Sequence, residues 1–267
     1  MRKLESICKH IAEYKECVNN KCGNFDELAS QVLAEALQVK ELLDDTTASP
    51  HIQLEESVWC DSLDCYINAV FIGEDDAIHI LSTSRGVGVN LYMYLPVQIP
   101  CQTMLEVMLQ IEKRIKCVEE KCWWEIYHVF FKQDFKFWHK TEGRDLLYSL
   151  QMAVMETKKL KYNPFKPQGE KANQTILQQF CHQWESVIND IINEVNEGAS
   201  YDDIRVCDKC GLPMSDGYYL GGKYACDDMC CLALYNGDKA QMEEDLSHVN
   251  EDYSDCYYTE WESIFFD

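Results

Sequence analysis

Residues 206–238 read VCDKCGLPMSDGYYLGGKYACDDMCCLALYNGD and contain two closely spaced cysteine pairs. Cys207 and Cys210 form a C-x-x-C pair, and Cys226 and Cys230 follow as a C-x-x-x-C pair after 15 intervening residues. Two such pairs on turns supply the four soft ligands that zinc binds in a tetrahedron. The spacing therefore predicts a structural zinc site with these four cysteines as its ligands.

The residues around the pairs predict the local fold. Gly211 permits the tight turn of a zinc knuckle after the first pair, and Gly217 with Gly221-Gly222 marks a hairpin between the pairs. Residues 232–234 continue as a short helix from the second pair. A knuckle, a hairpin and a helix that carries the last ligands form a treble-clef-like module, expected at residues 201–236. Cys231 is an alternative to Cys230 as the fourth ligand.

Two other interpretations of the quartet are reduced structural cysteines and a pair of disulfides. Free cysteine behaves as a small buried hydrophobic residue. The total of 15 cysteines is odd, and those outside the quartet are scattered through apolar segments. We therefore expect reduced thiols at seven of these positions: Cys8, Cys17, Cys60, Cys65, Cys101, Cys117 and Cys181.

The C-terminal sequence resembles a known group of proteins. The shared pattern is C-x-x-C-G-x-x-M-x-x-G-Y, then Y-x-C-x-D-x-C, and a tail that contains Tyr257-Tyr258-Thr259-Glu260-Trp261-Glu262. It is similar to the C-terminus of many small proteins encoded by bacterial phages, plasmids and conjugative elements. The resemblance covers about 60 of the 267 residues. It implies a zinc-stabilised module and a mobile-element origin, and the first 200 residues have no part in it.

The charge of the chain is strongly negative and uneven. Its 46 acidic and 24 basic residues give a formal net charge of −22. Residues 201–267 alone hold 16 acids and four bases, a net charge of −12. Phosphate backbones repel such a surface, so direct nucleic-acid binding is disfavoured, whereas a basic surface on a protein partner attracts it. Acidity that only keeps the protein soluble is the plainer explanation.

The tail at residues 237–267 mixes carboxylates with aromatic rings. Purely acidic disordered segments lack such rings, whereas an interface uses them as anchors within a charged rim. The alternative is that the rings dock on the protein's own body. As candidate partner-binding residues the tail offers Glu243, Glu244, Asp245, Tyr257, Tyr258 and Trp261.

The first 200 residues predict an α+β fold. Apolar residues recur at helical spacing in residues 1–48. Residues 49–200 begin with short β-rich runs between 58 and 95, whose close spacing favours an antiparallel β-meander packed with helices. Helices follow at 101–121, 143–161 and 170–197. The aromatic run at 122–138 fits either a helix or a strand, and lining the core is its simplest role.

These features predict a function that rests on contact rather than on catalysis. Four cysteine ligands leave zinc no open position for water, and no linear catalytic motif is present. No apolar run approaches the about 20 residues of a membrane span, and the N-terminus lacks a signal-like stretch, so we expect a cytoplasmic protein.

The most specific hypothesis is a non-enzymatic phage or mobile-element protein that inhibits a host anti-phage defence complex in the bacterial cytosol. Its partner would be a host complex that handles nucleic acid, met through an acidic surface. Two alternatives remain open: an enzyme with an unmarked active site in residues 50–140, and an accessory structural protein that self-associates as a homo-oligomer.

Overall fold

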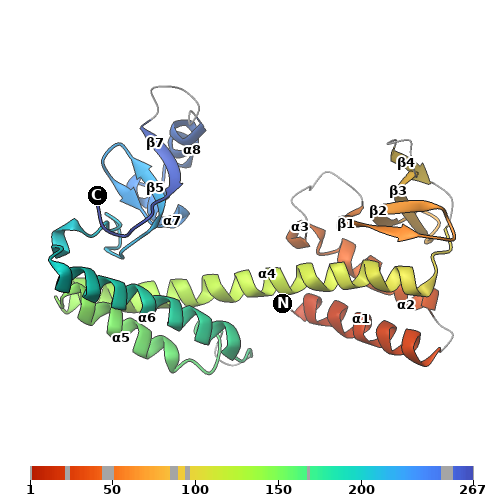
Figure 1. The fold of residues 1–267 in the computed structure, drawn as a ribbon, viewed down its shortest axis with the longest axis horizontal. Coiled ribbons are helices and arrows are strands. Elements are labelled where there is room, and N and C mark those ends of the chain that lie inside the picture. The colour runs from red at the N-terminus through yellow and green to blue at the C-terminus, as the bar shows by residue number, and fades with distance from the viewer. Residues whose placement is uncertain are drawn as a thin grey trace. The chain divides into compact units, whose positions relative to one another are not determined.

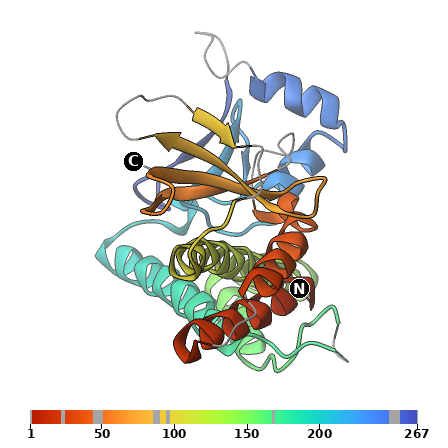
Figure 2. The ribbon, with the colours of Figure 1, turned by 90° about the vertical axis from the view of Figure 1, so that its right-hand side faces the viewer.

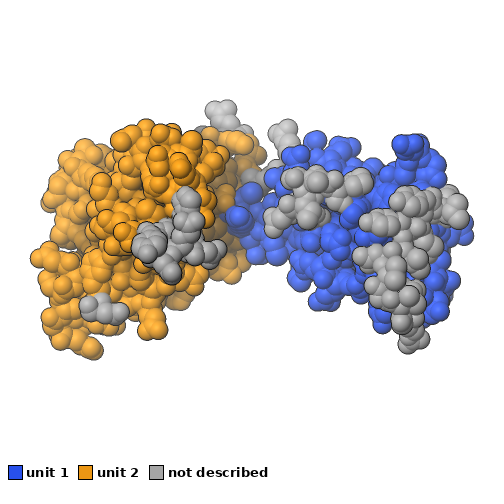
Figure 3. Space-filling view, turned by 90° about the horizontal axis from the view of Figure 1, so that it is seen from above, with its two compact units in different colours: residues 1–122 blue, residues 123–267 orange. Residues whose placement is uncertain are grey.

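The computed structural model describes residues 2–21, 25–43, 51–84, 90–93, 97–166, 169–247 and 255–266. The predicted tail at 237–267 therefore includes residues 248–254 and 267, which lie outside the described residues. The chain divides into two compact units, residues 1–122 and residues 123–267 (Figure 3). Helix α4 (Cys101–Lys136) contributes residues to both units.

The first unit combines helices with an antiparallel sheet, as the sequence predicts. The sheet has the simple order β1-β2-β3-β4, so each strand pairs with the next along the chain. This arrangement confirms the predicted β-meander. Besides α4, the elements of the unit are α1 (Arg2–Asn20), α2 (Phe25–Leu37), α3 (Lys40–Leu43), β1 (Ile52–Cys60), β2 (Cys65–Ile72), β3 (Ile78–Ser84) and β4 (Asn90–Met93).

One face of the sheet carries the core of this unit. Helices α1 and α2 and the first part of α4 lie against that face (Figures 1 and 2). Side chains along β2 alternate between the two faces of the sheet. Ile67 and Ala69 are buried, whereas the neighbouring Tyr66 is exposed. The buried side chains of α1 recur three or four residues apart, at Leu4, Ile7, Ile11 and Tyr14.

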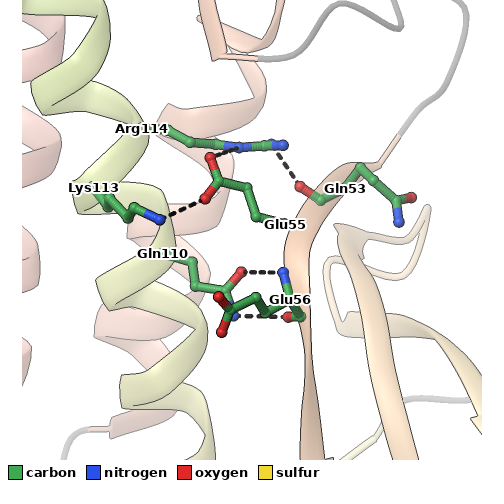
Figure 4. Close-up of polar contacts among 6 residues, drawn as sticks. All are labelled: Gln53, Glu55, Glu56, Gln110, Lys113 and Arg114. Atoms are coloured by element: carbon green, nitrogen blue, oxygen red, sulfur yellow. Dashed lines mark hydrogen bonds and ion pairs between the residues drawn. The ribbon is translucent and has the colours of Figure 1, made fainter.

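Strand β1 is irregular, and α4 compensates for the irregularity. The register with β2 shifts between Gln53 and Val58, which frees backbone groups from the ladder. The side-chain amide of Gln110 replaces these bonds: it accepts from Glu56 N at 3.2 Å and donates to Glu56 O at 2.8 Å (Figure 4). Beside it, Arg114 donates to Gln53 O at 2.6 Å. These backbone groups of the irregular segment are thereby satisfied without the partner strand.

The second unit contains a helical group and a small sheet. The aromatic run that the sequence left undecided is helical, because Tyr127, Phe131 and Phe135 recur every four residues and are fully buried on one face of α4. The stacked pair of Phe131 and Trp184, at 4.4 Å between centroids, joins α4 to α6. The helical elements are η1 (Phe137–Thr141, a π-helix), α5 (Leu146–Lys158), α6 (Gln174–Glu197), η2 (Tyr201–Asp203), α7 (Asp228–Leu234) and α8 (Lys239–Ser247).

The small sheet has the order β6-β5-β7 and is antiparallel. Its strands are β5 (Asp216–Leu220), β6 (Tyr224–Ala225) and β7 (Cys256–Glu260), drawn in blue in Figure 1. Strand β7 comes from the acidic aromatic tail and pairs with β5 from Asp216↔Glu260 to Leu220↔Cys256. We call the described part of the chain from 201 to 247 and from 255 to 266 the cysteine module.

Two further expectations meet the structure here. Among the described helices, none combines the length and apolar composition that crossing a bilayer requires.

Cys17 is disulfide-bonded, so the expectation of a reduced thiol is wrong at that position. The expectation is confirmed at the other six positions, where the cysteines are free.

Candidate metal centre

The four predicted ligands lie together. The sulfur atoms of Cys207, Cys210, Cys226 and Cys230 are all within 4.8 Å of one another. The Cys210 and Cys226 sulfurs are 3.5 Å apart. Four sulfurs held at about 2.3 Å from one zinc ion would be separated by about 3.8 Å, so the spacing fits a tetrahedral site. The quartet can therefore hold a metal ion, and soft thiolates suit zinc.

The first cysteine pair lies on a tight turn. Gly211 has φ of +85°, and its N–H donates to Cys207 O at 2.8 Å. The chain then returns, so that Cys207 N donates to Leu212 O at 2.9 Å. A backbone hydrogen bond from Cys210 reaches the Cys207 thiol. A residue with a side chain is strained at this φ, which explains the glycine after the pair.

The second pair is placed by a strand and a helix cap. Cys226 follows β6 directly, and Cys230 lies in the first turn of α7. Asp227 is the N-cap of that helix: its Oδ1 accepts from Cys230 N at 2.7 Å. Asp208 joins this half to the first pair, because its N donates to Tyr224 O and its Oδ2 accepts from Tyr224 N.

The quartet is crowded for uncharged thiols. Hydrogen bonds from the other three cysteines lower the pKa of Cys207. Hydrogen bonds with Cys207, Cys210 and Cys230, together with burial, raise the pKa of Cys226. Neighbouring thiolates repel one another, so the four cannot all ionise without a cation. A divalent cation would supply that charge and release the protons.

Cys231 lies outside the quartet although it is adjacent to Cys230. It is fully buried, and no group of candidate ligands among the described residues includes it. Burial, with Asp228 adding to it, raises the pKa of Cys231 to about 11. A thiol with that pKa remains protonated at neutral pH and is a poor ligand.

Helix α4 contacts the second cysteine pair. Lys132 Nζ lies 3.4 Å from Cys226 Sγ and 2.5 Å from Asp227 Oδ2. His128, one turn earlier, places Nε2 3.6 Å from the same carboxylate oxygen. His128, Cys226 and Asp227 thus form a second close group of candidate ligands. Because the oxygens of Asp227 already accept hydrogen bonds from Cys230 N and Lys132, this group supports the cysteine centre.

The same helix end also contacts the first pair. Lys140 of η1 donates to Lys209 O, between the two ligands of the C-x-x-C turn, at 2.8 Å. A Cβ added at Gly211 would lie 3.3 Å from the ring of His139. The centre is therefore held against the end of α4 and η1 by both of its halves.

The tail residues proposed from the sequence have different environments. Glu243 and Glu244 are exposed, and Tyr257 and Tyr258 are 36% and 53% exposed. Asp245 is half-buried and accepts a hydrogen bond from Tyr235 at 2.9 Å. Trp261 is half-buried and its ring faces the guanidinium of Arg205.

Sequence reasoning missed Lys132, His128 and Arg205. Lys132 and Cys226 are separated by 94 positions, so no local motif links the helix to the metal centre. Arg205 is one of only four basic residues in residues 201–267, and it is buried. Its contacts are with Trp261, Ser263 and Phe266, which are distant in the sequence, so no local pattern indicates that it supports the module.

Comparison with known proteins gives no relative. No family model, no curated protein and no solved structure matches the chain.

Proposed function

We propose that this protein acts by binding another protein, as a phage or mobile-element inhibitor of a host anti-phage defence complex. The proposal is carried by one observation: the cysteine module presents exposed tyrosines among carboxylates. Residues 201–267 have a net charge of −12. In such an interface the rings would be anchors, and the carboxylates would steer a basic partner toward them.

The pairing of tyrosine with carboxylate recurs on β5 and β7. Tyr258 donates to Asp216 Oδ2 at 3.0 Å, and Tyr218 donates to Asp228 Oδ1 at 2.5 Å. The two rings meet edge to face, 5.2 Å apart. Negative charge is thereby fixed at defined positions on an ordered surface. These carboxylates carry the same negative charge as the phosphates of a nucleic acid, so a basic protein surface that normally binds phosphates would attract them. This favours a nucleic-acid-handling complex as the partner.

The zinc ion in this proposal is structural. Four cysteine ligands would close its coordination sphere, so it would contribute folding free energy instead of activating water. A turn, a hairpin and a short helix carry the ligands, and we propose that they form a treble-clef-like module. Its role would be to hold β5, and with it β7, in place. The bacterial cytosol, where free thiols persist, is the proposed location.

A charge-reversal experiment tests the proposal. The tagged protein is used to capture partners from a bacterial host lysate, in low and high salt and with added double-stranded DNA. The variant Glu243→Lys/Glu244→Lys reverses two exposed charges on α8, and Glu194→Lys/Glu197→Lys makes the same change on exposed positions of α6. Asp245 is left intact because it bonds Tyr235.

We expect the wild-type protein to capture a DNA- or RNA-binding complex. Added DNA should displace this complex, high salt should weaken its binding, and only the α8 variant should fail to capture it. A captured complex that persists through high salt, DNA and both variants would count against the acidic-surface hypothesis. Catalytic turnover of a bacterial metabolite, or a purified protein that only self-associates, would favour the two alternatives.

A further inference from the structure

We propose that Lys132 of α4 is the charge-compensating partner of the cysteine metal centre, and that it tunes both the affinity of the site and the electronic character of its thiolates. This inference rests on the proposed zinc site and adds a residue to it from outside the cysteine module.

The position of Lys132 is unusual for a lysine. Its side chain is only 17% exposed, although lysine is rarely buried without a partner. Its partners include Cys226 Sγ at 3.4 Å and Asp227 Oδ2 at 2.5 Å, and its side chain also hydrogen-bonds with Cys230. Contact with a sulfur ligand places the ammonium group next to the first coordination sphere.

The charges of a loaded centre require such a group. Four thiolates and one divalent ion sum to −2, and three of the four ligand residues, Cys207, Cys210 and Cys230, are buried. Uncompensated buried charge is costly. An ammonium group that donates to a thiolate offsets part of it and withdraws electron density from the sulfur.

Cys226 is a ligand whose sulfur lies 3.4 Å from this ammonium group. It is half-exposed, whereas the other three are buried. Asp227, the next residue, extends the effect: its Oδ2 accepts from Lys132 while its Oδ1 caps the helix that carries Cys230. Lys132 therefore contacts Cys226 and Cys230 directly and also orients Cys230 through Asp227. It acts as a positioning residue that also carries charge.

Four variants separate charge from packing. Lys132→Met keeps the aliphatic stem and removes the ammonium group, and Lys132→Gln keeps an N–H donor without charge. Lys132→Arg restores both charge and donor. Lys136→Met removes an exposed lysine one turn further along α4 and is the matched control.

Metal affinity is measured by competition with a chromophoric chelator, using zinc as the probe. We expect Lys132→Met to weaken zinc binding by about 10- to 100-fold, the usual effect of removing an outer-sphere partner. Lys132→Gln should show most of the same loss of zinc affinity. Lys132→Arg and Lys136→Met should keep a zinc affinity within about threefold of the wild type, which corresponds to less than about 0.7 kcal/mol.

Cobalt(II) substitution gives a readout that packing alone would not move. Removing a positive charge from the sulfur raises the energy of its lone pairs, so the thiolate-to-cobalt charge-transfer band should shift to longer wavelength in Lys132→Met. The d–d bands, which report tetrahedral geometry, should remain. A variant that fails to fold would lose both sets of bands, and Lys132→Gln and Lys132→Arg would then carry the test.

The outcomes distinguish the two proposals. A wild-type protein without bound zinc would overturn the zinc site itself. Bound zinc with equal affinity in Lys132→Met, equal losses in Lys132→Met and Lys136→Met, or full affinity in Lys132→Gln would each overturn the role of Lys132 and leave the zinc site standing.

Discussion

The guanidinium carbon of Arg205 lies 4.4 Å from the ring centroid of Trp261, and this contact attaches the C-terminal segment to the start of the cysteine module. Arg205 is buried, and Phe266 faces the same guanidinium at 4.9 Å. Arg205 also donates to Ser263 O at 2.6 Å. A desolvated cation held between rings is worth more than the same contact in water.

Replacing Arg205 with methionine should release the residues after β7. We expect a loss of about 2 kcal/mol in the free energy of unfolding, from the cation–π contacts and the charged hydrogen bond together. Chemical denaturation of the zinc-loaded protein measures the loss, and limited proteolysis should show earlier cleavage near the C-terminus. Arg144→Met is the control, because exposed Arg144 lies over a single ring, Tyr148, at 5.4 Å. Equal losses in the two variants would contradict this account.

The part of the fold that local sequence determines was predictable. The spacing of Cys207, Cys210, Cys226 and Cys230 identified a quartet whose sulfurs do lie together, because short turns fix such distances. Close strand spacing likewise predicted the meander, since two strands joined by a few residues must pair antiparallel.

The part that depends on distant contacts was not predictable. The tail at residues 255–266 forms β7 and packs around Arg205, although its acidity alone gave no strand register. Lys132 lies within the aromatic run at residues 122–138, whose pattern is set by its rings and gives no sign of a charged contact. Its contact with Cys226 exists because Phe131 and Phe135, on either side of it, are buried and fix the rotation of α4.

Gly217 should be the glycine of the sheet least tolerant of substitution. Its φ is +143°, and an added Cβ would lie 2.4 Å from Ala225 O and 2.5 Å from Met214 Cε. We expect Gly217→Ala to reduce the free energy of unfolding by about 3 kcal/mol, from backbone strain and overpacking. Gly143→Ala is the matched control: its φ is +65°, yet no atom lies within 4 Å of the added Cβ, so about 1 kcal/mol is expected. Denaturant unfolding compares the two, and similar losses would show that space at Gly217 is not limiting.

Asp75 gives the first unit a dependence on pH. A hydrogen bond from His79, at 2.8 Å, holds the pKa of Asp75 below its ordinary value. A carboxylate whose pKa is lower in the folded chain stabilises it fully above the unfolded value of about 4, and this contribution is lost as pH falls through the folded value. We therefore expect Asp75→Asn to destabilise β2 and β3 at pH 7 and progressively less toward pH 3.

Hydrogen exchange of the β2 and β3 amides measures this local stability at each pH. Asp76→Asn removes the same charge from the same turn and should change stability by less than about 0.5 kcal/mol. A difference between the wild type and Asp75→Asn that stays constant from pH 7 to pH 3 would mean that the carboxylate charge contributes nothing.

Cys230 and Cys231 offer the sharpest test of the metal centre, because they are adjacent, both buried and identical in chemistry. Cys230→Ala removes one of the four clustered sulfurs, so we expect zinc affinity to fall by more than about 100-fold, beyond the effect of an outer-sphere change. Cys231→Ala removes a thiol whose pKa burial raises to about 11, so zinc affinity should stay within about threefold while stability falls by about 1 kcal/mol. Chelator competition and metal analysis of the purified variants measure both effects.

A larger loss of zinc affinity in Cys231→Ala than in Cys230→Ala would make Cys231 the fourth ligand. It would also require α7 to rotate, since the N–H of Cys230 is fixed by Asp227. Equal retention of zinc by both variants would mean that neither sulfur is required, and the four-cysteine centre would then be wrong.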